Sequence, residues 1–179
     1  MSIEFEAKVI EINPAEMEQK IMQAGGKKVR EALMKRYVYD IDPNRRGHWI
    51  RLRDDGDQVT LTVKKIHHDG ISGTEEEEIV VQDFEKTNQL LRLMGFSPSA
   101  YQENHRTSFV LDGAQLEIDH WPLIPAYLEI EADSYERVVE VGRMLDLKEE
   151  QLTGENTTKI YKRYGIDLDQ KRELRFVTK

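Results

Sequence analysis

The chain has 179 residues, of which 39% are hydrophobic and 34% charged, and it contains no cysteine. This composition is typical of one globular domain with a real core, and it excludes a disordered tail, a fibrous repeat, a disulfide framework and cysteine-ligated metal centres. The formal net charge of -8 argues against general electrostatic attraction to nucleic acid or to an anionic membrane, so a polyanionic ligand would need a local cationic site or bridging metal ions.

Alternation of apolar and polar residues predicts strands along the first half of the chain. A strand is expected at 3–9, and a short amphipathic helix follows from Asn13 and Pro14 to a stop at Gly25. Four further strands are expected at 35–41, 48–54, 58–66 and 74–81. The turn residues between them, at 43–47, 54–57 and 69–73, predict hairpin connections.

The second half of the chain predicts helices at 83–94, from a Ser134 cap to about 145, and at 157–164, with strands at 105–111, 115–121 and 127–132. A charged tail from about 166 is expected on the surface. No internal repeat or linker marks a second domain, so residues 1–179 are expected to form one domain. About eight antiparallel strands with helices at intervals favour an α+β fold built on a closed or nearly closed barrel, because closure removes exposed sheet edges.

Polar residues recur at every second position of five predicted strands, and residues two apart in a strand point to the same face. On any one strand this pattern is the ordinary solvated face of an antiparallel sheet. Several short amphipathic helices are available to cover the apolar faces, however, which would turn the charged faces toward the barrel interior. A barrel of about eight strands holds side chains and one small ligand. The recurring polar sets are Glu4, Glu6 and Lys8; Arg51 and Arg53; Thr62 and Lys64; Glu117 and Asp119; and Glu129 and Glu131.

The charges assigned to the interior indicate what the barrel would bind. Eight acids and six bases leave -2, and two divalent cations would change this to +2, a field suited to a triphosphate of about -4. Oxygen ligands and the absence of cysteine favour Mg²⁺ or Mn²⁺ over zinc. The acids are Glu4, Glu6, Glu76, Glu78, Glu117, Asp119, Glu129 and Glu131; the bases are Lys8, Arg51, Arg53, Lys64, Arg106 and Lys159.

The segment from Glu4 to Lys8 resembles the Glu-x-Glu-x-Lys signature of the CYTH superfamily, the triphosphate tunnel metalloenzymes. This superfamily includes class IV adenylate cyclases, thiamine triphosphatases and inorganic triphosphatases. Later landmarks resemble family strands in the same order, and the match runs from residue 4 to about residue 164. These landmarks are Arg51-Leu52-Arg53, Thr62-Val63-Lys64, Glu76 and Glu78, Arg106, Asp119, Glu129-Ile130-Glu131 and Lys159.

The resemblance implies an eight-stranded antiparallel tunnel that binds a triphosphate and a divalent metal. It implies that Glu4, Glu6 and Glu131 hold the activating metal, with Glu129 and Asp119 near it or near a second metal. It places Lys64, Glu4 and Glu6 in the catalytic set, and Glu76 and Glu78 among additional tunnel acids. Glu117, which strand parity turns inward, is either a further tunnel acid or a rim carboxylate. The phosphate-binding residues that the resemblance implies are Lys8, Arg51, Arg53, Lys64, Arg106 and Lys159.

Three positions leave alternatives open. Asn104 stands where many family members have a second lysine, two residues before Arg106, so one phosphate contact is not accounted for. In the run of four glutamates at 75–78, Glu76 and Glu78 are expected inward because the alternate positions share a face with apolar residues. Lys159 lies on an expected helix, where it is either a phosphate contact or an exposed surface lysine.

The first functional hypothesis is metal-dependent hydrolysis of inorganic triphosphate or of a nucleoside or thiamine triphosphate. The alternative is a class IV adenylate cyclase that converts ATP to cyclic AMP and diphosphate. Cyclase members often carry a His-Phe pair ahead of the signature, and only residues 1–3 precede Glu4, which favours hydrolysis. A further alternative is a non-catalytic polyphosphate or nucleotide sensor, although an anion binder has little use for interior carboxylates.

The first residues lack the basic and apolar regions of an export signal, and no apolar run approaches the roughly 18 residues that span a bilayer. Together with the absence of cysteine, this predicts a cytoplasmic protein with no membrane or nucleic-acid partner and a small triphosphate-bearing substrate. Family members are often dimeric, and the apolar helix residues suit either a homodimer contact or the cover of the barrel.

Overall fold

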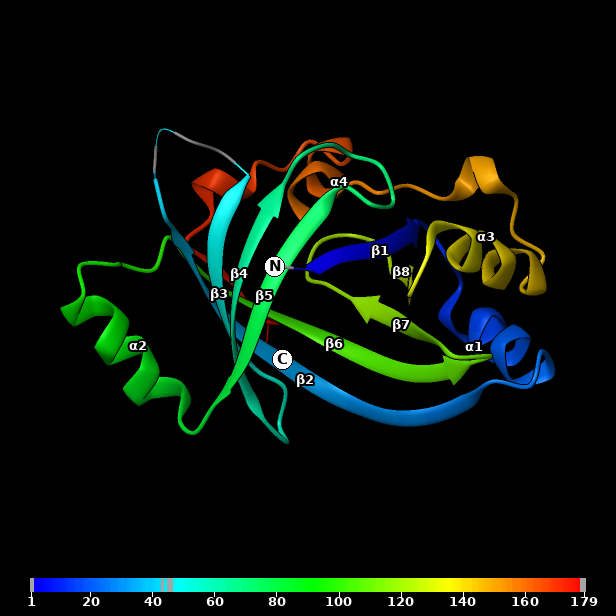
Figure 1. The fold of residues 1–179 in the computed structure, drawn as a ribbon, viewed down its shortest axis with the longest axis horizontal. Coiled ribbons are helices and arrows are strands. Elements are labelled where there is room, and N and C mark those ends of the chain that lie inside the picture. The colour runs from blue at the N-terminus through cyan, green and yellow to red at the C-terminus, as the bar shows by residue number, and fades with distance from the viewer. Residues whose placement is uncertain (1, 43, 45–46, 178–179) are drawn as a thin grey trace.

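Eight antiparallel strands form a closed barrel in the computed structural model, which describes residues 2–42, 44 and 47–177 (Figure 1). The sheet order is β2-β3-β4-β5-β1-β8-β7-β6, and pairing of β2 with β6 closes the barrel. The expected α+β barrel is therefore confirmed. The strands are β1 (Ser2–Val9), β2 (Lys27–Asp40), β3 (His48–Asp54), β4 (Val59–Ile66), β5 (Thr74–Val81), β6 (Ala100–Leu111), β7 (Ala114–His120) and β8 (Tyr127–Ala132).

Two strands are much longer than the sequence predicts. β2 begins at Lys27 instead of residue 35, and β6 begins at Ala100 instead of residue 105. These additions lie in the β2–β6 ladder, which runs from Lys27 opposite Val110 to Val38 opposite Ala100. Neither addition has clean apolar–polar alternation, so the pairing that closes the barrel determines them. The expected connection at 43–47 lies partly outside the described residues.

Each of the four α-helices in the described residues begins directly after a polar residue whose side chain accepts a hydrogen bond from a backbone N–H of the first turn. Because capping is local, the sequence places these starts to within a residue or two. The helices with their caps are α1 (Pro14–Gln23, Asn13), α2 (Phe84–Leu93, Asp83), α3 (Tyr135–Met144, Ser134) and α4 (Thr157–Arg163, Asn156). None of the helices in the described ranges combines the length and apolar character required to cross a membrane.

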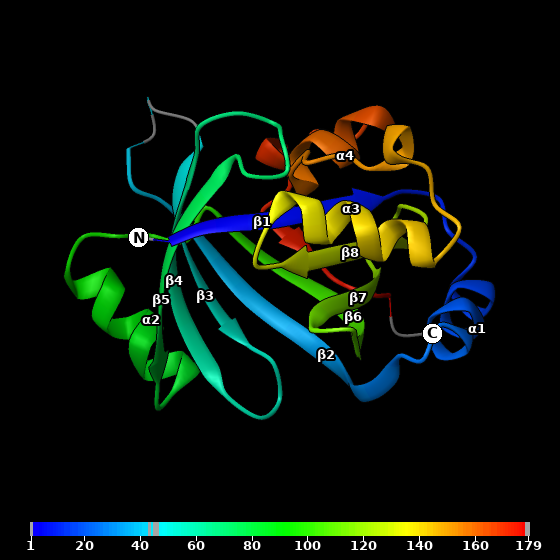
Figure 2. The same cartoon turned by 45° about the vertical axis from the view of Figure 1, so that its right-hand side comes forward.

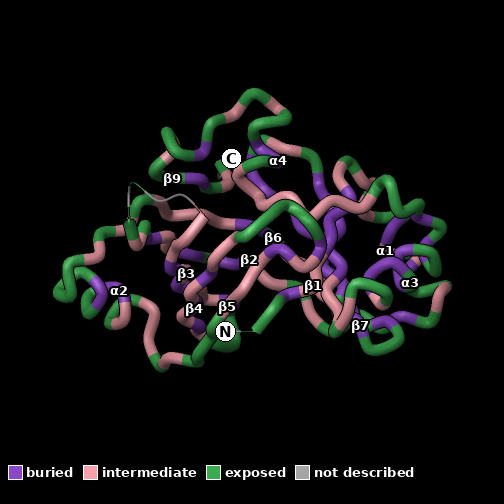
Figure 3. The backbone as a smooth tube through the Cα atoms, turned by 45° about the horizontal axis from the view of Figure 1, so that its top comes forward, coloured by how far each residue is buried: buried purple, intermediate pink, exposed green. Residues whose placement is uncertain are grey.

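The helices cover the outside of the barrel, so the apolar strand faces point outward. α3 packs across β1 and β8 (Figure 2), and Leu128 and Ile130 of β8 form one core with Val138 of α3. At the other end of the barrel, Leu52 of β3 packs with Leu91 of α2. Burial alternates clearly along β3 and β4, whereas β8 is buried on both faces over Tyr127–Ile130, and Figure 3 colours the chain by this burial. The charged faces of these strands therefore line the interior.

The last part of the chain differs from the expected surface tail. A 3₁₀ turn, η2 (Leu168–Gln170), precedes a two-residue strand, β9 (Glu173–Leu174), which pairs in parallel with β6. Leu168 and Leu174 are buried with Trp121 and Tyr161. Two leucines in a charged run have no periodic pattern, so only the fold shows that they anchor this segment to the barrel.

Candidate active site

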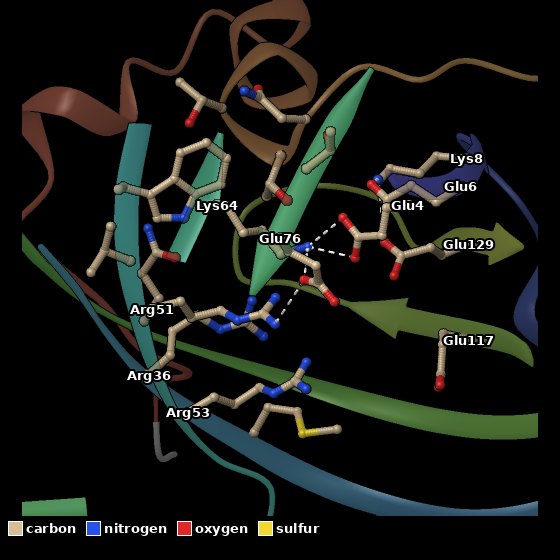
Figure 4. A pocket seen from close by; sticks show the side chains of 18 of the residues that line it. Glu4, Glu6, Lys8, Arg36, Arg51, Arg53, Lys64, Glu76, Glu117 and Glu129 are labelled. Atoms are coloured by element: carbon tan, nitrogen blue, oxygen red, sulfur yellow. Dashed lines mark hydrogen bonds and ion pairs between the residues drawn. The ribbon is translucent and has the colours of Figure 1, made fainter. Parts of the chain in front are cut away.

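A cavity of about 1100 Å³ lies inside the barrel, and each of its eight strands contributes at least one charged side chain. Figure 4 shows that the cavity is polarised, with three arginines grouped on one side, several glutamates on the other, and Lys64 between the two groups. Among the charged lining residues are Glu4, Glu6 and Lys8 of β1, Arg36 of β2, Arg51 and Arg53 of β3, Lys64 of β4, Glu76 and Glu78 of β5, Arg106 of β6, Glu117 of β7, and Glu129 and Glu131 of β8.

Lys64 joins two strands that are distant in sequence. Its Nζ donates to both carboxylate oxygens of Glu4, at 2.7 and 2.8 Å, and lies 3.1 Å from Oε2 of Glu76 (Figure 4). Burial raises the pKa of Glu4 to about 8, because the nearby Glu6 and Glu76 add to the cost of its charge while Lys64 only partly offsets it. Three carboxylates, of Glu4, Glu6 and Glu76, are therefore crowded around Lys64 in this part of the site.

Lys8 forms the second ion-pair centre and is only 2% exposed. Its Nζ pairs with Glu6 and lies 3.3 Å from Oε2 of Glu129. Burial disfavours the lysine charge, but Glu6 and Glu129 outweigh burial and raise the pKa of Lys8. Burial likewise disfavours the charge of Glu129, and Lys8 and Arg106 outweigh it and lower the pKa of that carboxyl. The Lys8–Glu129 pair is thus held in its charged form.

Arg106 forms a third centre with the carboxylates of β7 and β8. Its guanidinium makes a bidentate contact with Asp119, at 2.8 Å from Nε and 2.6 Å from Nη2, and Nη2 also donates to Glu129 at 3.2 Å. Asp119 is fully buried and accepts a further hydrogen bond from Asn104 at 2.8 Å. Glu117 accepts from Ser108 at 2.6 Å and lies 3.9 Å from Arg106, so it belongs to this centre.

The parity expected for the glutamate run is confirmed. Glu78 faces inward, where it pairs with Arg51 at 3.1 Å and accepts a hydrogen bond from Thr62 at 2.5 Å. Glu76 faces Lys64, whereas Glu75 lies on the other face and pairs with His67 at 2.9 Å. Cross-strand pairing explains the arrangement, since Thr62 is opposite Glu78 in the β4–β5 ladder.

The guanidinium groups of the cationic side retain unused donors. The Nε atoms of Arg36, Arg51 and Arg53 are buried and have no hydrogen-bond partner in the described part of the chain. The positive charge of Arg51, followed by burial, lowers the pKa of Arg53 to about 10. Buried donors without partners and mutually repelling cations are costly, and an anionic ligand would relieve both costs.

Arg36 is a site residue that the sequence patterns missed. It is 8% exposed and lines the cavity, and burial, followed by the charges of Arg51, Arg53 and Arg106, lowers its pKa to about 9. The same-face neighbours of Arg36 in β2 are Met34 and Val38, so no polar doublet marks this strand. The other charged lining residues of β2, Arg30 and Asp40, are separated from Arg36 by apolar same-face positions, so no period-two polar signal marks it.

Lys159 lies apart from the ion-pair centres. It is half-exposed on α4, pairs with Asp69, and contributes to the cavity lining. The structure therefore brings together all the predicted tunnel residues on strands, and places this helix lysine at the periphery, where it reaches the same cavity.

Comparisons with known proteins identify the family. A model of the CYTH domain matches residues 2–164. The chain belongs to the CYTH family. No curated protein sequence matches it at a significant level.

Solved structures share the CYTH fold over most of their length. A conserved hypothetical protein of Pyrococcus furiosus is 25% identical with a TM-score of 0.74, covering 86% of this chain and 97% of that one. A candidate adenylate cyclase of Vibrio parahaemolyticus is 16% identical with a TM-score of 0.75, covering 90% and 98%. A candidate adenylyl cyclase of Hippeastrum, described as having a dominant triphosphatase activity, is 17% identical with a TM-score of 0.60, covering 91% and 96%.

The carboxylates of this CYTH tunnel fit a hard divalent cation by their chemistry. Burial, followed by the charges of Glu129 and Glu6, raises the pKa of Glu131 to about 7, so these acids compete to remain charged in the absence of a metal. As the side chains stand, no three Asp, Glu or His groups of the described residues converge on one point. Lys64 and Lys8 hold Glu4 and Glu6 instead, so metal binding requires these ion pairs to rearrange.

Proposed function

We propose that this CYTH protein hydrolyses a small triphosphate substrate inside its tunnel with the help of Mg²⁺ or Mn²⁺. The observation that carries the proposal is the polarised cavity, in which arginines with unused buried donors face carboxylates with raised pKa values. The carboxylates do not fill all the hydrogen-bond donors of the arginines, and the arginines do not compensate all the charge of the carboxylates. A triphosphate supplies the acceptors that the arginines lack, and a divalent cation supplies the charge that the acids lack.

Arg51 and Arg53 would bind oxygens of the phosphate chain. Both lie on one strand face, 16% or less exposed at the side chain, and both direct guanidinium groups into the cavity. Glu78 is shared between them in the structure, at 3.1 and 3.7 Å, so it holds the pair in position before the substrate arrives. Planar guanidinium groups suit the oxygen geometry of phosphates.

Glu4, Glu6 and Glu131, with Glu129 and Asp119 nearby, would hold the cation. The bound cation would neutralise phosphate charge and polarise the reacting phosphoryl group. Holding a cation would draw Glu4 away from Lys64, whose Nζ donates to it at 2.7 Å. The ammonium of Lys64 would then be available to hold a phosphate oxygen or to orient the attacking water.

In the proposed reaction, a water oxygen forms a bond to the terminal phosphorus while the bond from that phosphorus to its bridging oxygen breaks. Inorganic phosphate and the shortened phosphate chain are the products, and the proton lost by the water passes to solvent. Lys8 and Arg106 remain in their charged forms throughout, because both are buried among carboxylates that raise their pKa. They supply fixed positive charge near the leaving phosphate oxygens.

Cyclisation of ATP is the second candidate, because the relatives from Vibrio parahaemolyticus and Hippeastrum are described as candidate cyclases. Hydrolysis stands first, since the Hippeastrum protein is described as having a dominant triphosphatase activity. We also propose that the protein acts in the cytoplasm and binds its substrate within one domain.

The test measures phosphate release and cyclic AMP formation from tripolyphosphate, ATP and thiamine triphosphate, each with Mg²⁺ or Mn²⁺. We expect phosphate release by the unchanged protein and its loss in Glu4→Gln and Glu6→Gln. Glu75→Gln is the matched control, because Glu75 faces outward on the strand that carries the inward Glu76. Tight binding without turnover of any substrate would indicate a sensor, and normal rates in Glu4→Gln would refute the metal site.

A further inference from the structure

Arg36 occupies a central place in the cationic side of the cavity. In the ladders of β2 it lies opposite Arg53 of β3 and opposite Gln102 of β6. Directly opposed residues of antiparallel strands share a face, so Arg36 points inward beside Arg53. Figure 4 shows Arg36, Arg51 and Arg53 as one group on the same side of the cavity.

Within the described residues, Arg36 differs from the other tunnel arginines because no carboxylate forms a direct ion pair with it. Arg51 and Arg53 pair with Glu78, and Arg106 pairs with three carboxylates. None of the ion pairs formed within the described segments of the chain includes Arg36. A cation that is 8% exposed and surrounded by like charges is unfavourable unless an anion joins it.

Neutral groups hold the Arg36 guanidinium in place. One Nη atom donates to the side-chain oxygen of Asn104, which in turn donates to Asp119 at 2.8 Å. The guanidinium carbon lies 4.6 Å from the centroid of the Trp121 ring, a cation–π contact. These contacts fix the group while its buried Nε has no partner within the described structure. The arrangement positions a charged donor without neutralising it.

We propose that Arg36 is a substrate-binding residue that contacts an oxygen of the phosphate chain, an inference that rests on the proposed function. Many family members have a lysine at the position of Asn104 in β6. In this chain Arg36 of β2 supplies a positive charge at that place instead. Asn104 then has a positioning role, because it holds the guanidinium and links it to Asp119. The chemical class that Arg36 recognises is a phosphate oxyanion, whether of free tripolyphosphate or of a nucleotide.

The test measures equilibrium binding of tripolyphosphate by calorimetry in EDTA, so that no turnover occurs. Loss of one charge-assisted contact in Arg36→Gln should raise the Kd about 10- to 100-fold, and Arg36→Lys should recover part of this loss. Arg143→Gln is the matched control, since the Arg143 side chain is 69% exposed on α3 and lies outside the tunnel. Its Kd should stay within about twofold of the unchanged protein.

Thermal unfolding without ligand separates binding from a structural role. Arg36→Gln should unfold at the same or a higher temperature, because it removes an unpaired buried charge, and tripolyphosphate should stabilise it less than the unchanged protein. An unchanged Kd in folded Arg36→Gln would overturn the role of Arg36 and leave the proposed function intact. The role of Arg36 would also be overturned if the increase in Kd disappeared after correction for the fraction of Arg36→Gln that is folded. If the unchanged protein binds no tripolyphosphate either in EDTA or with Mg²⁺ present, the proposed function itself fails.

Discussion

Replacing Glu131 with glutamine should remove a pH-dependent weakness of the metal-free protein. Burial, with the neighbouring charges of Glu129 and Glu6, raises the pKa of Glu131 from 4.5 to about 7. A carboxyl whose pKa is higher in the folded state stabilises the fold below its unfolded pKa, and that stabilisation is lost as the pH rises through the folded pKa. For Glu131 the loss therefore occurs between about pH 4.5 and pH 7.

The magnitude follows from the width of this interval. At about 1.4 kcal/mol for each pH unit, the metal-free protein should lose about 3 kcal/mol of unfolding free energy through Glu131. The glutamine in Glu131→Gln cannot ionise. The unfolding free energy of this variant should therefore be close to that of the unchanged protein near pH 5 and exceed it by about 3 kcal/mol at pH 8. This loss is a large share of the unfolding free energy of a typical domain, which is roughly 5–15 kcal/mol.

Urea unfolding followed by circular dichroism, in EDTA at several pH values from 5 to 8, measures this difference. Groups such as Glu129, whose pKa is lowered, lose their contribution only as the pH falls below their unfolded values, so they act outside this interval. Glu136→Gln should show no such trend, because Glu136 is exposed on α3, outside the tunnel. Millimolar Mg²⁺ should stabilise the unchanged protein more than Glu131→Gln.

A difference between Glu131→Gln and the unchanged protein that stays constant from pH 5 to pH 8 would refute this reasoning. It would mean that the carboxyl is not buried among other acids. Equal stabilisation of both proteins by Mg²⁺ would instead remove Glu131 from the proposed metal ligands while leaving its burial intact.

Three further predictions concern stability, and urea unfolding near neutral pH measures each of them. Lys8→Met should cost about 3–5 kcal/mol, because it leaves Glu6 and Glu129 buried without their lysine; a loss below about 1 kcal/mol would contradict this pairing. Asn13→Ala removes the cap of α1 and should cost about 1 kcal/mol without changing triphosphate binding, whereas no loss would show that the cap contributes nothing. Leu128→Ala should cost about 2–5 kcal/mol because Leu128 is fully buried between the barrel and α3, and a near-neutral change would place it outside the core.

Strand parity accounts for most of what the sequence predicts correctly about the tunnel. The inward positions of Glu4, Glu6 and Lys8, and of Glu129 and Glu131, follow from a period of two and from the helices that cover the apolar faces. Helix starts are equally predictable, because a capping side chain acts on backbone groups within its own first turn. Both signals are local and can be read from a few neighbouring residues.

The contacts between inward residues could not be predicted in the same way. Lys64 meets Glu4 across 60 positions of sequence, and the pairing depends on which strands become neighbours and in what register. The extension of β2 to Lys27 depends on β6 in the same manner. A one-residue change of register would reverse the faces of a whole strand, so these contacts exist only once the barrel has closed.

The sequence by itself therefore determined the composition of the tunnel: which barrel strands exist, which faces carry the recurring charges, and that no cysteine thiol is available as a ligand. The tertiary structure alone decided how those charges are distributed. It brought Arg36 to an inward position, held by Asn104 and Trp121 with no direct ion pair to the described carboxylates, and it crowded Glu131 against other acids. The physical reason is that burial and pairing are properties of three-dimensional neighbours, and a closed barrel draws those neighbours from strands far apart in the chain.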